Sequence, residues 1–251
     1  MRRFIRKTFT YLKSFIFWCR PHLYFGWLRL AMFWFANLLS LSKWISKQKK
    51  INVLNDFFQL KRDYSKRYQL YEYIINKFDL KDKPFDYIEF GVSEGYSIKW
   101  WSEHIEHPKT RFFGFDTFEG LPEKWGTYRK GDMNCSMPQF EDERVTLVKG
   151  LFQETLPDFL KNQYDSKYRK VIHLDADLFS STLFVLTSMA PVLRCGDILF
   201  FDEFNVPNHE FLAFKFFTES YYLKIKMLGA VNNYAQVAFM IENGAALADG
   251  N

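Results

Sequence analysis

The chain has 251 residues, of which 48% are hydrophobic and 25% are charged, and its net charge is +5. This composition excludes a disordered chain, a collagen and a small disulfide scaffold, and it is typical of one large α/β domain with an appendage. Cys19, Cys135 and Cys195 show no Cys-x-x-Cys spacing, which favours reduced thiols over a zinc site or a disulfide framework.

The charge is distributed unevenly along the chain. Residues 1–50 hold 11 of the 34 Lys and Arg residues and no Asp or Glu, and the first acid is Asp56. The remaining 201 residues therefore hold 23 basic and 29 acidic side chains. We predict a basic helical extension over residues 1–50 that binds a surface, followed by a globular domain over residues 51–251.

The extension contains two apolar stretches, at residues 9–19 and 23–41, and the Arg20–Pro21 pair breaks the helix between them. The second stretch is about long enough to span a bilayer, but it contains Arg29 and Asn37. An Arg near the centre of a span costs roughly 2.5–3.5 kcal/mol. We therefore favour helices that lie in the interface of an anionic membrane, with four tryptophans at headgroup depth: Trp18, Trp27, Trp34 and Trp44.

Two other interpretations of the extension stay open. Its helices could pack on the domain or on a second copy of the chain, as the aromatic stripe of a homo-oligomer interface does. A secretory signal peptide is less favoured, because Lys13 and Arg20 interrupt the apolar region and no small-residue cleavage site follows. We expect a cytoplasmic protein that attaches peripherally to the inner face of the membrane.

Beyond the extension, short apolar runs alternate with helical patterns, which predicts an α/β domain with a Rossmann-like, doubly wound and mostly parallel sheet. We predict seven strands, the last two forming a C-terminal β-hairpin that turns at residues 229–233: residues 87–90, 111–115, 145–149, 171–174, 198–201, 223–228 and 236–241. Helices are predicted at residues 56–78, 96–106, 155–161, 181–193 and 209–218. Ligands of such sheets bind at the carboxyl ends of the strands, so the residues that follow each run are the candidates for a site.

The first two runs end in residues that suit a nucleoside. Glu89 precedes a turn with Gly91 and Gly95, but Ser93 replaces the second glycine of the G-x-G-x-x-G fingerprint, so a pyrophosphate is disfavoured. The second run ends in Asp116, where an acid can accept hydrogen bonds from ribose hydroxyls or cap a helix. S-adenosylmethionine, which is cationic at its sulfur and its amine, fits this pattern best.

Carboxylates follow the fourth and fifth runs. Asp175 and Asp177 lie beyond one strand, and Asp202 and Glu203 lie beyond the next. Neighbouring strand ends bring these acids together, and oxygen ligands without a Cys or His cluster favour Mg²⁺ over zinc. The alternative is that some of them cap the following helices, with Asp177 the best candidate.

Five segments between residues 86 and 217 resemble, in the same order, the macrocin O-methyltransferase (TylF-like) family of class I S-adenosylmethionine-dependent methyltransferases. They read I-E-F-G-V-S-E-G, G-F-D-T-F-E-G-L-P-E, V-K-G-L-F-Q-E-T-L-P, I-H-L-D-A-D-L-F-S-S-T and F-D-E-F. The resemblance implies methyl transfer to a hydroxyl of a sugar or glycoconjugate, with Asp175 as the candidate base. We keep His173 as a less favoured alternative base, which the resemblance does not imply. It also implies Mg²⁺ on Asp175, Asp202 and Glu203. The residues predicted to bind the cofactor are Glu89, Gly91, Ser93, Gly95, Asp116, Thr117, Phe118, Gly150 and Phe152.

The expected acceptor is a small-molecule or lipid-linked saccharide, covered by a lid in the long connection at residues 119–144. No nucleic-acid partner is expected. The rival functions are a non-catalytic module that binds the cofactor and a membrane-attached scaffold, which would be indifferent to Asp175→Ala. A hydride-transfer enzyme is weaker, because the glycine fingerprint is broken.

Overall fold

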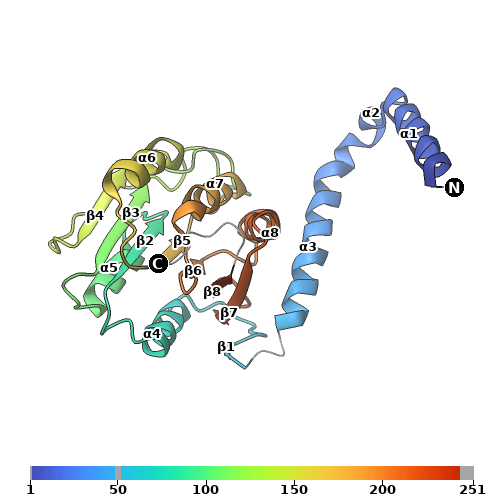
Figure 1. Ribbon diagram of the computed structural model, residues 1–251. Coiled ribbons are helices and arrows are strands. Elements are labelled where there is room, and N and C mark those ends of the chain that lie inside the picture. The colour runs from blue at the N-terminus through green and yellow to red at the C-terminus, as the bar shows by residue number, and fades with distance from the viewer. Residues whose placement is uncertain (1, 49–51, 244–251) are drawn as a thin grey trace.

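Eight strands form a single sheet in the part of the chain that the computed structural model describes, residues 2–48 and 52–243 (Figure 1). Their order across the sheet is β1-β7-β8-β6-β5-β2-β3-β4, in which β8 runs antiparallel to β6 and β7 and the other neighbouring pairs are parallel. The strands are β1 (Leu54–Asn55), β2 (Phe85–Phe90), β3 (Arg111–Asp116), β4 (Val145–Lys149), β5 (Arg169–Leu174), β6 (Ile198–Phe201), β7 (Lys224–Val231) and β8 (Gln236–Asn243).

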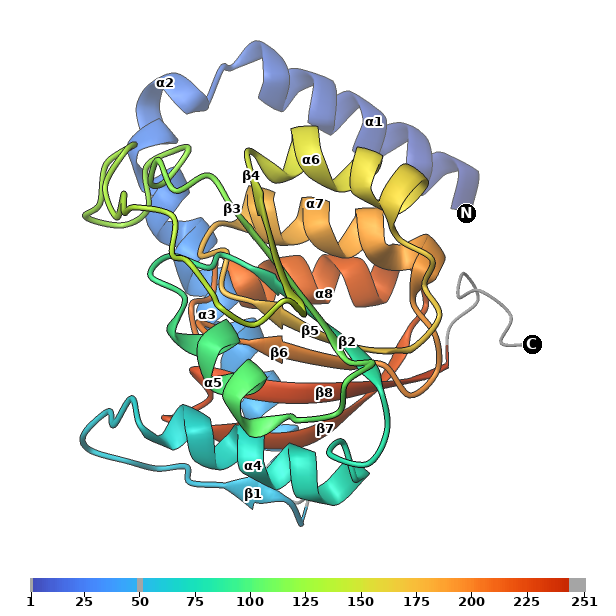
Figure 2. The same cartoon turned by 90° about the vertical axis from the view of Figure 1, so that its left-hand side faces the viewer.

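Helices cover both faces of the sheet, with α6, α7 and α8 above it and α4 and α5 below it in Figure 2. Alternating side chains of each strand fill the two layers: Tyr87 packs with the α4 and α5 layer, and Ile88 packs with the α6 to α8 layer. Both are buried, as expected for strands covered on both faces. The helices are α4 (Lys66–Phe78), α5 (Tyr96–His104), α6 (Phe152–Asp158), α7 (Phe179–Met189) and α8 (Glu210–Ser220), with short turns η2 (Phe159–Gln163) and η3 (Ala190–Val192).

The predicted α/β class, the mostly parallel sheet, the C-terminal hairpin and the preceding helices are confirmed, but the number of strands was wrong. The additional strand β1 has two residues, and it pairs in parallel with β7 at the edge of the sheet. A run this short leaves no alternating hydrophobic pattern in the sequence.

The hairpin turn also differs from the prediction. β7 continues through Gly229 to Val231, and the turn is formed by residues that include Asn232 and Asn233, both at positive φ. Gly229 is needed for packing, because a Cβ there would lie 2.8 Å from a methyl group of Leu70 on α4. The glycine was a turn signal in the sequence, whereas its role is close approach between layers.

Helix α4 begins at Lys66, ten residues after the predicted start. Residues 56–65 instead form an irregular segment that lies against the hairpin turn: the Gln59 N–H donates to Asn233 Oδ1 (2.8 Å), and the Asp63 N–H donates to Asn232 Oδ1 (2.9 Å). These tertiary hydrogen bonds satisfy backbone groups that a helix would have paired locally.

The extension is helical: α1 (Arg2–Trp18), α2 (His22–Phe25), η1 (Gly26–Leu28) and α3 (Arg29–Gln48). The predicted break is confirmed, with Arg20 at φ 51° between α1 and α2. The second half of α3 joins the main core, because Leu41 is 3% exposed and the Trp44 ring lies 5.0 Å from that of Phe204. None of the described helices combines the length and the apolar character that crossing a bilayer requires.

Candidate active site

A cleft of about 620 Å³ opens at the carboxyl ends of the strands. Its walls come from the loops after β2, β3, β4, β5 and β6 and from the segment before α4, as expected for an open α/β sheet. The polar and glycine residues that line it include Arg62, Arg67, Gly91, Ser93, Asp116, Thr117, Gly120, Asp175, Asp177, Ser181, Asp202 and Glu203.

Gly91 brings the turn after β2 against the loop after β5. Its φ is +96°, and a Cβ on it would overlap the main-chain oxygen of Asp175. The Gly91 N–H donates to the Phe115 carbonyl, and the Asp175 N–H donates to the Phe90 carbonyl, each at 2.9 Å. Only glycine permits this close packing, which leaves an open surface of backbone at the floor of the cleft.

The Asp116 carboxylate is fixed at the end of β3 by two backbone amides. The Ser93 N–H donates to Oδ2 at 2.8 Å, and the Phe118 N–H donates to Oδ1 at 2.7 Å. A carboxylate oxygen can accept a second hydrogen bond, so Asp116 can receive two hydroxyl donors from the cleft that it lines. This is the arrangement that a ribose diol requires.

The predicted cofactor residues fall into two groups. Gly91, Ser93, Asp116, Thr117 and Phe152 line the cleft. The other four support it without lining it: Glu89, Gly95, Phe118 and Gly150.

Glu89 lies beneath the floor of the cleft in a buried polar network. The residue is 1% exposed, and its Oε2 accepts a hydrogen bond from the Tyr87 hydroxyl at 2.7 Å. The same hydroxyl lies 2.8 Å from Nδ1 of His173. Burial raises the pKa of Glu89 to about 8, although the Tyr87 hydrogen bond opposes the rise. Burial, reinforced by Arg67, lowers the pKa of His173 to about 3. His173 is thus a neutral core residue, and its position does not support the alternative role of base.

Glu89→Gln should change the pH dependence of stability. A pKa raised from 4.5 to about 8 means that the folded state keeps a proton that the unfolded state releases, so the free energy of unfolding falls as pH rises between these values. Glutamine keeps an acceptor for Tyr87 and removes the titration. The free energy of unfolding of the variant, relative to that of the wild type, should therefore rise by up to about 1.4 kcal/mol per pH unit across this window. Urea unfolding at several pH values tests this, and parallel curves for the two proteins would contradict it.

Four acids line the opposite wall of the cleft: Asp175 and Asp177 after β5, and Asp202 and Glu203 after β6. Burial and then the Asp202 charge raise the pKa of Asp175 well above its ordinary value. Burial and then the Glu203 charge raise the pKa of Asp177 to about 7. Asp177 does not cap α7, whose N-cap is Leu178 without a side-chain hydrogen bond. Asp177 therefore lines the cleft and does not cap the helix that follows it.

Two arginines that the sequence analysis did not assign to the site face these acids. Arg67 Nη2 lies 3.0 Å from Asp202 Oδ2, and Arg62 Nη2 lies 2.6 Å from Glu203 Oε1. Both come from the end of the irregular segment and the first turn of α4. In the sequence these arginines belong to the basic run K-R-D-Y-S-K-R. The helix predicted over residues 56–78 gave no reason to connect this run with the cleft.

The four acids of this wall offer the type of ligand atom that a divalent cation prefers. All donors are carboxylate oxygens, and Oδ1 of Asp202 is buried without a hydrogen-bond partner. Within residues 2–48 and 52–243, however, no three His, Cys, Asp or Glu side chains are grouped as a metal site requires. A cation on Asp175, Asp202 and Glu203 would have to replace the contacts that Arg62 and Arg67 make.

The connection between β3 and β4 forms an aromatic wall. Trp125 and Tyr128 stack with ring centroids 5.5 Å apart and planes at 13°, and their backbones bond to each other. The Ser180 hydroxyl donates to Glu123 Oε1 (2.6 Å), which ties the connection to α7. Both rings line the cleft, so the predicted cover over residues 119–144 borders the space that an acceptor would occupy.

Comparison with known proteins agrees with this geometry. A family model described as a methyltransferase domain matches residues 88–204, which include Asp116, Asp175 and Asp202. A search of curated proteins gives no match.

Solved structures that resemble the chain include the following three. A structure of CalS11, described as calicheamicin methyltransferase, is 21% identical with a TM-score of 0.55, covering 71% of this chain and 80% of that chain. An apo structure of CalS11, described as a TDP-rhamnose 3'-O-methyltransferase, is 22% identical with a TM-score of 0.50 and the same coverage, 71% and 80%. The O-methyltransferase NovP is 19% identical with a TM-score of 0.53, covering 70% and 77%.

At these identities the structures show the fold alone. The prediction of a methyltransferase domain agrees with the family match, whereas the narrower macrocin O-methyltransferase family stays a prediction.

Proposed function

We propose that the protein is an S-adenosylmethionine-dependent O-methyltransferase that acts on a hydroxyl of a saccharide. The observation that carries the proposal is the placement of two kinds of acid on opposite walls of one cleft. Asp116, fixed by two backbone amides, suits a ribose, and Asp175 lies across the floor formed by Gly91. The methyltransferase family match over these residues supports the cofactor.

In this proposal the cofactor lies over the turn after β2. Asp116 would accept hydrogen bonds from its ribose hydroxyls, and Phe152, the first residue of α6, would border its adenine. The backbone at Gly91 would support the methionine part, and the acids of the opposite wall would attract the sulfonium.

Transfer follows an in-line displacement. The acceptor oxygen forms a bond to the methyl carbon while the bond from that carbon to sulfur breaks, and the bonding electrons go to sulfur, leaving S-adenosylhomocysteine. Asp175 accepts the hydroxyl proton. Among the described residues no side chain or backbone group donates a hydrogen bond to the Asp175 carboxyl, so its oxygens are available to the acceptor. Positioning by the cleft walls supplies much of the rate.

The saccharide acceptor is supported by the aromatic wall. Sugar rings present C–H faces that pack on aromatic rings, and Trp125 and Tyr128 offer a stacked pair in the cleft that Asp175 also lines. The sugar nucleotide in the description of one CalS11 structure makes nucleotide-linked sugars the first acceptors to assay, with free and lipid-linked saccharides after them.

A transfer assay tests this function. Incubation with S-adenosylmethionine carrying a tritiated methyl group and a panel of these saccharides should label at least one acceptor, and Asp175→Asn should remove the label. A labelled product that forms equally with Asp175→Asn would contradict the role of Asp175. Transfer of no label to any saccharide of the panel would contradict the acceptor class.

Mg²⁺ would be held by Asp175, Asp202 and Glu203 only after it displaced Arg62 and Arg67 from these acids, and a bound ion would supply positive charge that lowers the pKa of the acceptor hydroxyl. We expect a chelator to lower turnover, added Mg²⁺ to restore it, and added Mg²⁺ to raise the midpoint of thermal unfolding. Asp202→Asn should lose the thermal shift, and Asp82→Asn, at an exposed position, should keep it. If a chelator has no effect and the midpoint does not move, Arg62 and Arg67 alone balance the acids.

A further inference from the structure

The first part of the extension projects from the rest of the protein as an arm, which we define as residues 5–35 (Figure 1). Every residue of the arm except Leu28 is exposed. Six of its large apolar side chains are 48–78% exposed: Phe9, Trp18, Leu23, Trp27, Leu30 and Trp34. So large an apolar surface is unfavourable in water and marks a site of interaction.

Helix α3 has an exposed first part and a partly buried second part, and the boundary between them is the end of the arm. Leu41 is 3% exposed in the main core, whereas Leu30, three turns earlier on the same helix, is 65% exposed. Between them Asn37 Nδ2 donates to Asn208 Oδ1 at 2.8 Å. This bond fixes the helix to the loop that follows β6, and the arm begins beyond it.

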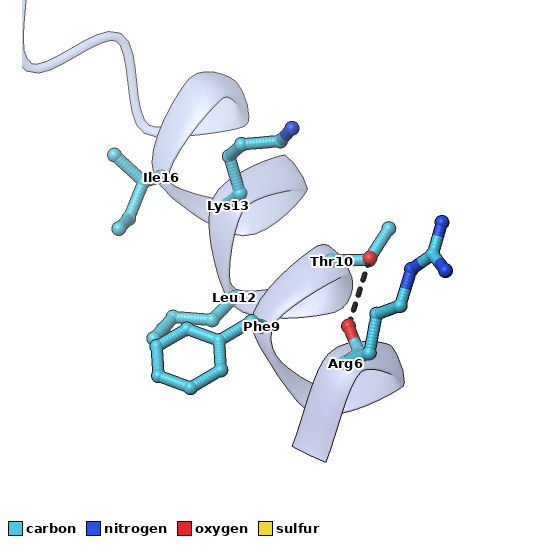
Figure 3. Close-up of a pocket in the computed structure, with 6 residues that line it drawn as sticks. All are labelled: Arg6, Phe9, Thr10, Leu12, Lys13 and Ile16. Atoms are coloured by element: carbon cyan, nitrogen blue, oxygen red, sulfur yellow. Dashed lines mark hydrogen bonds between the residues drawn. The ribbon is translucent and has the colours of Figure 1, made fainter. Parts of the chain in front are cut away.

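Helix α1 separates apolar from basic side chains. Phe9, Leu12 and Ile16 project to one side, and Arg6 and Lys13 border them along one edge of the same groove (Figure 3). The apolar residues follow the spacing of a single helical face. A helix with one apolar face and a basic polar face is the form that lies in the plane of a membrane interface.

The net positive charge of the arm indicates an anionic binding partner. It contains five Lys and Arg residues and no Asp or Glu: Arg6, Lys7, Lys13, Arg20 and Arg29. Contact between two such arms would bring like charges together, which is unfavourable. Anionic lipid headgroups neutralise them instead, and the tryptophan rings suit the boundary between headgroups and acyl chains.

We propose that the arm binds the surface of an anionic lipid bilayer, with the apolar side chains in the outer acyl region and the basic side chains at the lipid phosphates. The proposal does not depend on the proposed methyltransferase activity. The arm lies in the plane of the interface and does not cross the bilayer.

Vesicle flotation of the full chain tests the proposal, with vesicles of phosphatidylcholine alone and of phosphatidylcholine mixed with phosphatidylglycerol. We expect flotation with the anionic vesicles, weaker flotation with the neutral ones, and a loss at high salt. Replacing Arg6, Lys13, Arg20 and Arg29 by Gln should lower the partition coefficient about a hundredfold or more. The matched control replaces four exposed lysines of the domain by Gln and should float like the wild type: Lys81, Lys83, Lys109 and Lys161.

A second variant separates the apolar contribution. Replacing Trp18, Trp27 and Trp34 by Ser should also reduce flotation, while the midpoint of thermal unfolding stays unchanged because these side chains are exposed. Recovery of the wild type in the buffer fraction with both kinds of vesicle would overturn the proposal. Equal flotation of the wild type and the four-Gln variant would overturn the role of charge. A dimer in sedimentation that dissociates with the Ser variant and does not float would assign the arm to a second copy.

Discussion

Asp175→Asn is expected to lower turnover by about 10²–10⁴-fold, the usual contribution of a positioned general base. Asparagine has nearly the same shape, so the backbone contact between residue 175 and Gly91 should survive. The amide of asparagine cannot accept the proton of the acceptor hydroxyl. Methyl transfer, which normally accompanies removal of this proton, therefore slows. Steady-state rates with a saturating acceptor measure this effect.

Two controls make the result specific to the chemistry. Calorimetry should give nearly the same affinity for S-adenosylmethionine in Asp175→Asn as in the wild type, because the proposed ribose contacts of Asp116 are kept. Asp177, Asp202 and Glu203 also still supply negative charge on the wall that faces the sulfonium. Asp82→Asn, at an exposed position, should leave both quantities unchanged. Wild-type turnover in Asp175→Asn would show that another group takes the proton, and Asp177 would be the first to examine.

Asp116→Ala is expected to raise the dissociation constant for S-adenosylmethionine by about 10²–10³-fold. The variant removes two proposed hydrogen bonds from ribose hydroxyls to a charged acceptor, each with a net contribution of about 1.5–3 kcal/mol, and the lower part of this range accounts for the expected loss. It also removes the hydrogen-bond acceptor of the Ser93 and Phe118 backbone amides. This loosens the turn after β2, over which the methionine part is proposed to bind.

Asp116→Asn is the milder variant for comparison. It keeps one acceptor oxygen and should weaken binding less than Ala does. The matched control is Glu119→Ala, in the same loop and with its side chain 75% exposed, which should bind like the wild type. Equal affinity of Asp116→Ala and the wild type would contradict the position assigned to the ribose.

Much of this site could be predicted because the fold rule and the residue pattern act together. Apolar runs indicate the strands, and parallel strands place their carboxyl ends at one edge, so the sequence alone predicts Asp116 and Asp175 on the same cleft. Both line it. Gly91 followed from the same reasoning, since a turn at a strand end requires a residue without a side chain.

The parts that could not be predicted depend on contacts between distant segments. The irregular stretch at residues 56–65 is held by Asn232 and Asn233, which no local pattern reveals, and a helix was predicted there instead. Arg67 was consequently not connected with Asp202. The burial of Glu89 depends equally on tertiary packing, because alternation shows which face a strand residue takes but not how deep it lies.

Titration of the purified full chain with S-adenosylmethionine in a calorimeter, and separately with NAD, tests the central claim most directly. The account predicts saturable binding of one S-adenosylmethionine per chain, weakened by Asp116→Ala, and no binding of NAD. Binding of NAD without S-adenosylmethionine, or no heat with either ligand, would contradict it, since the Gly91 turn and Asp116 would then have another purpose.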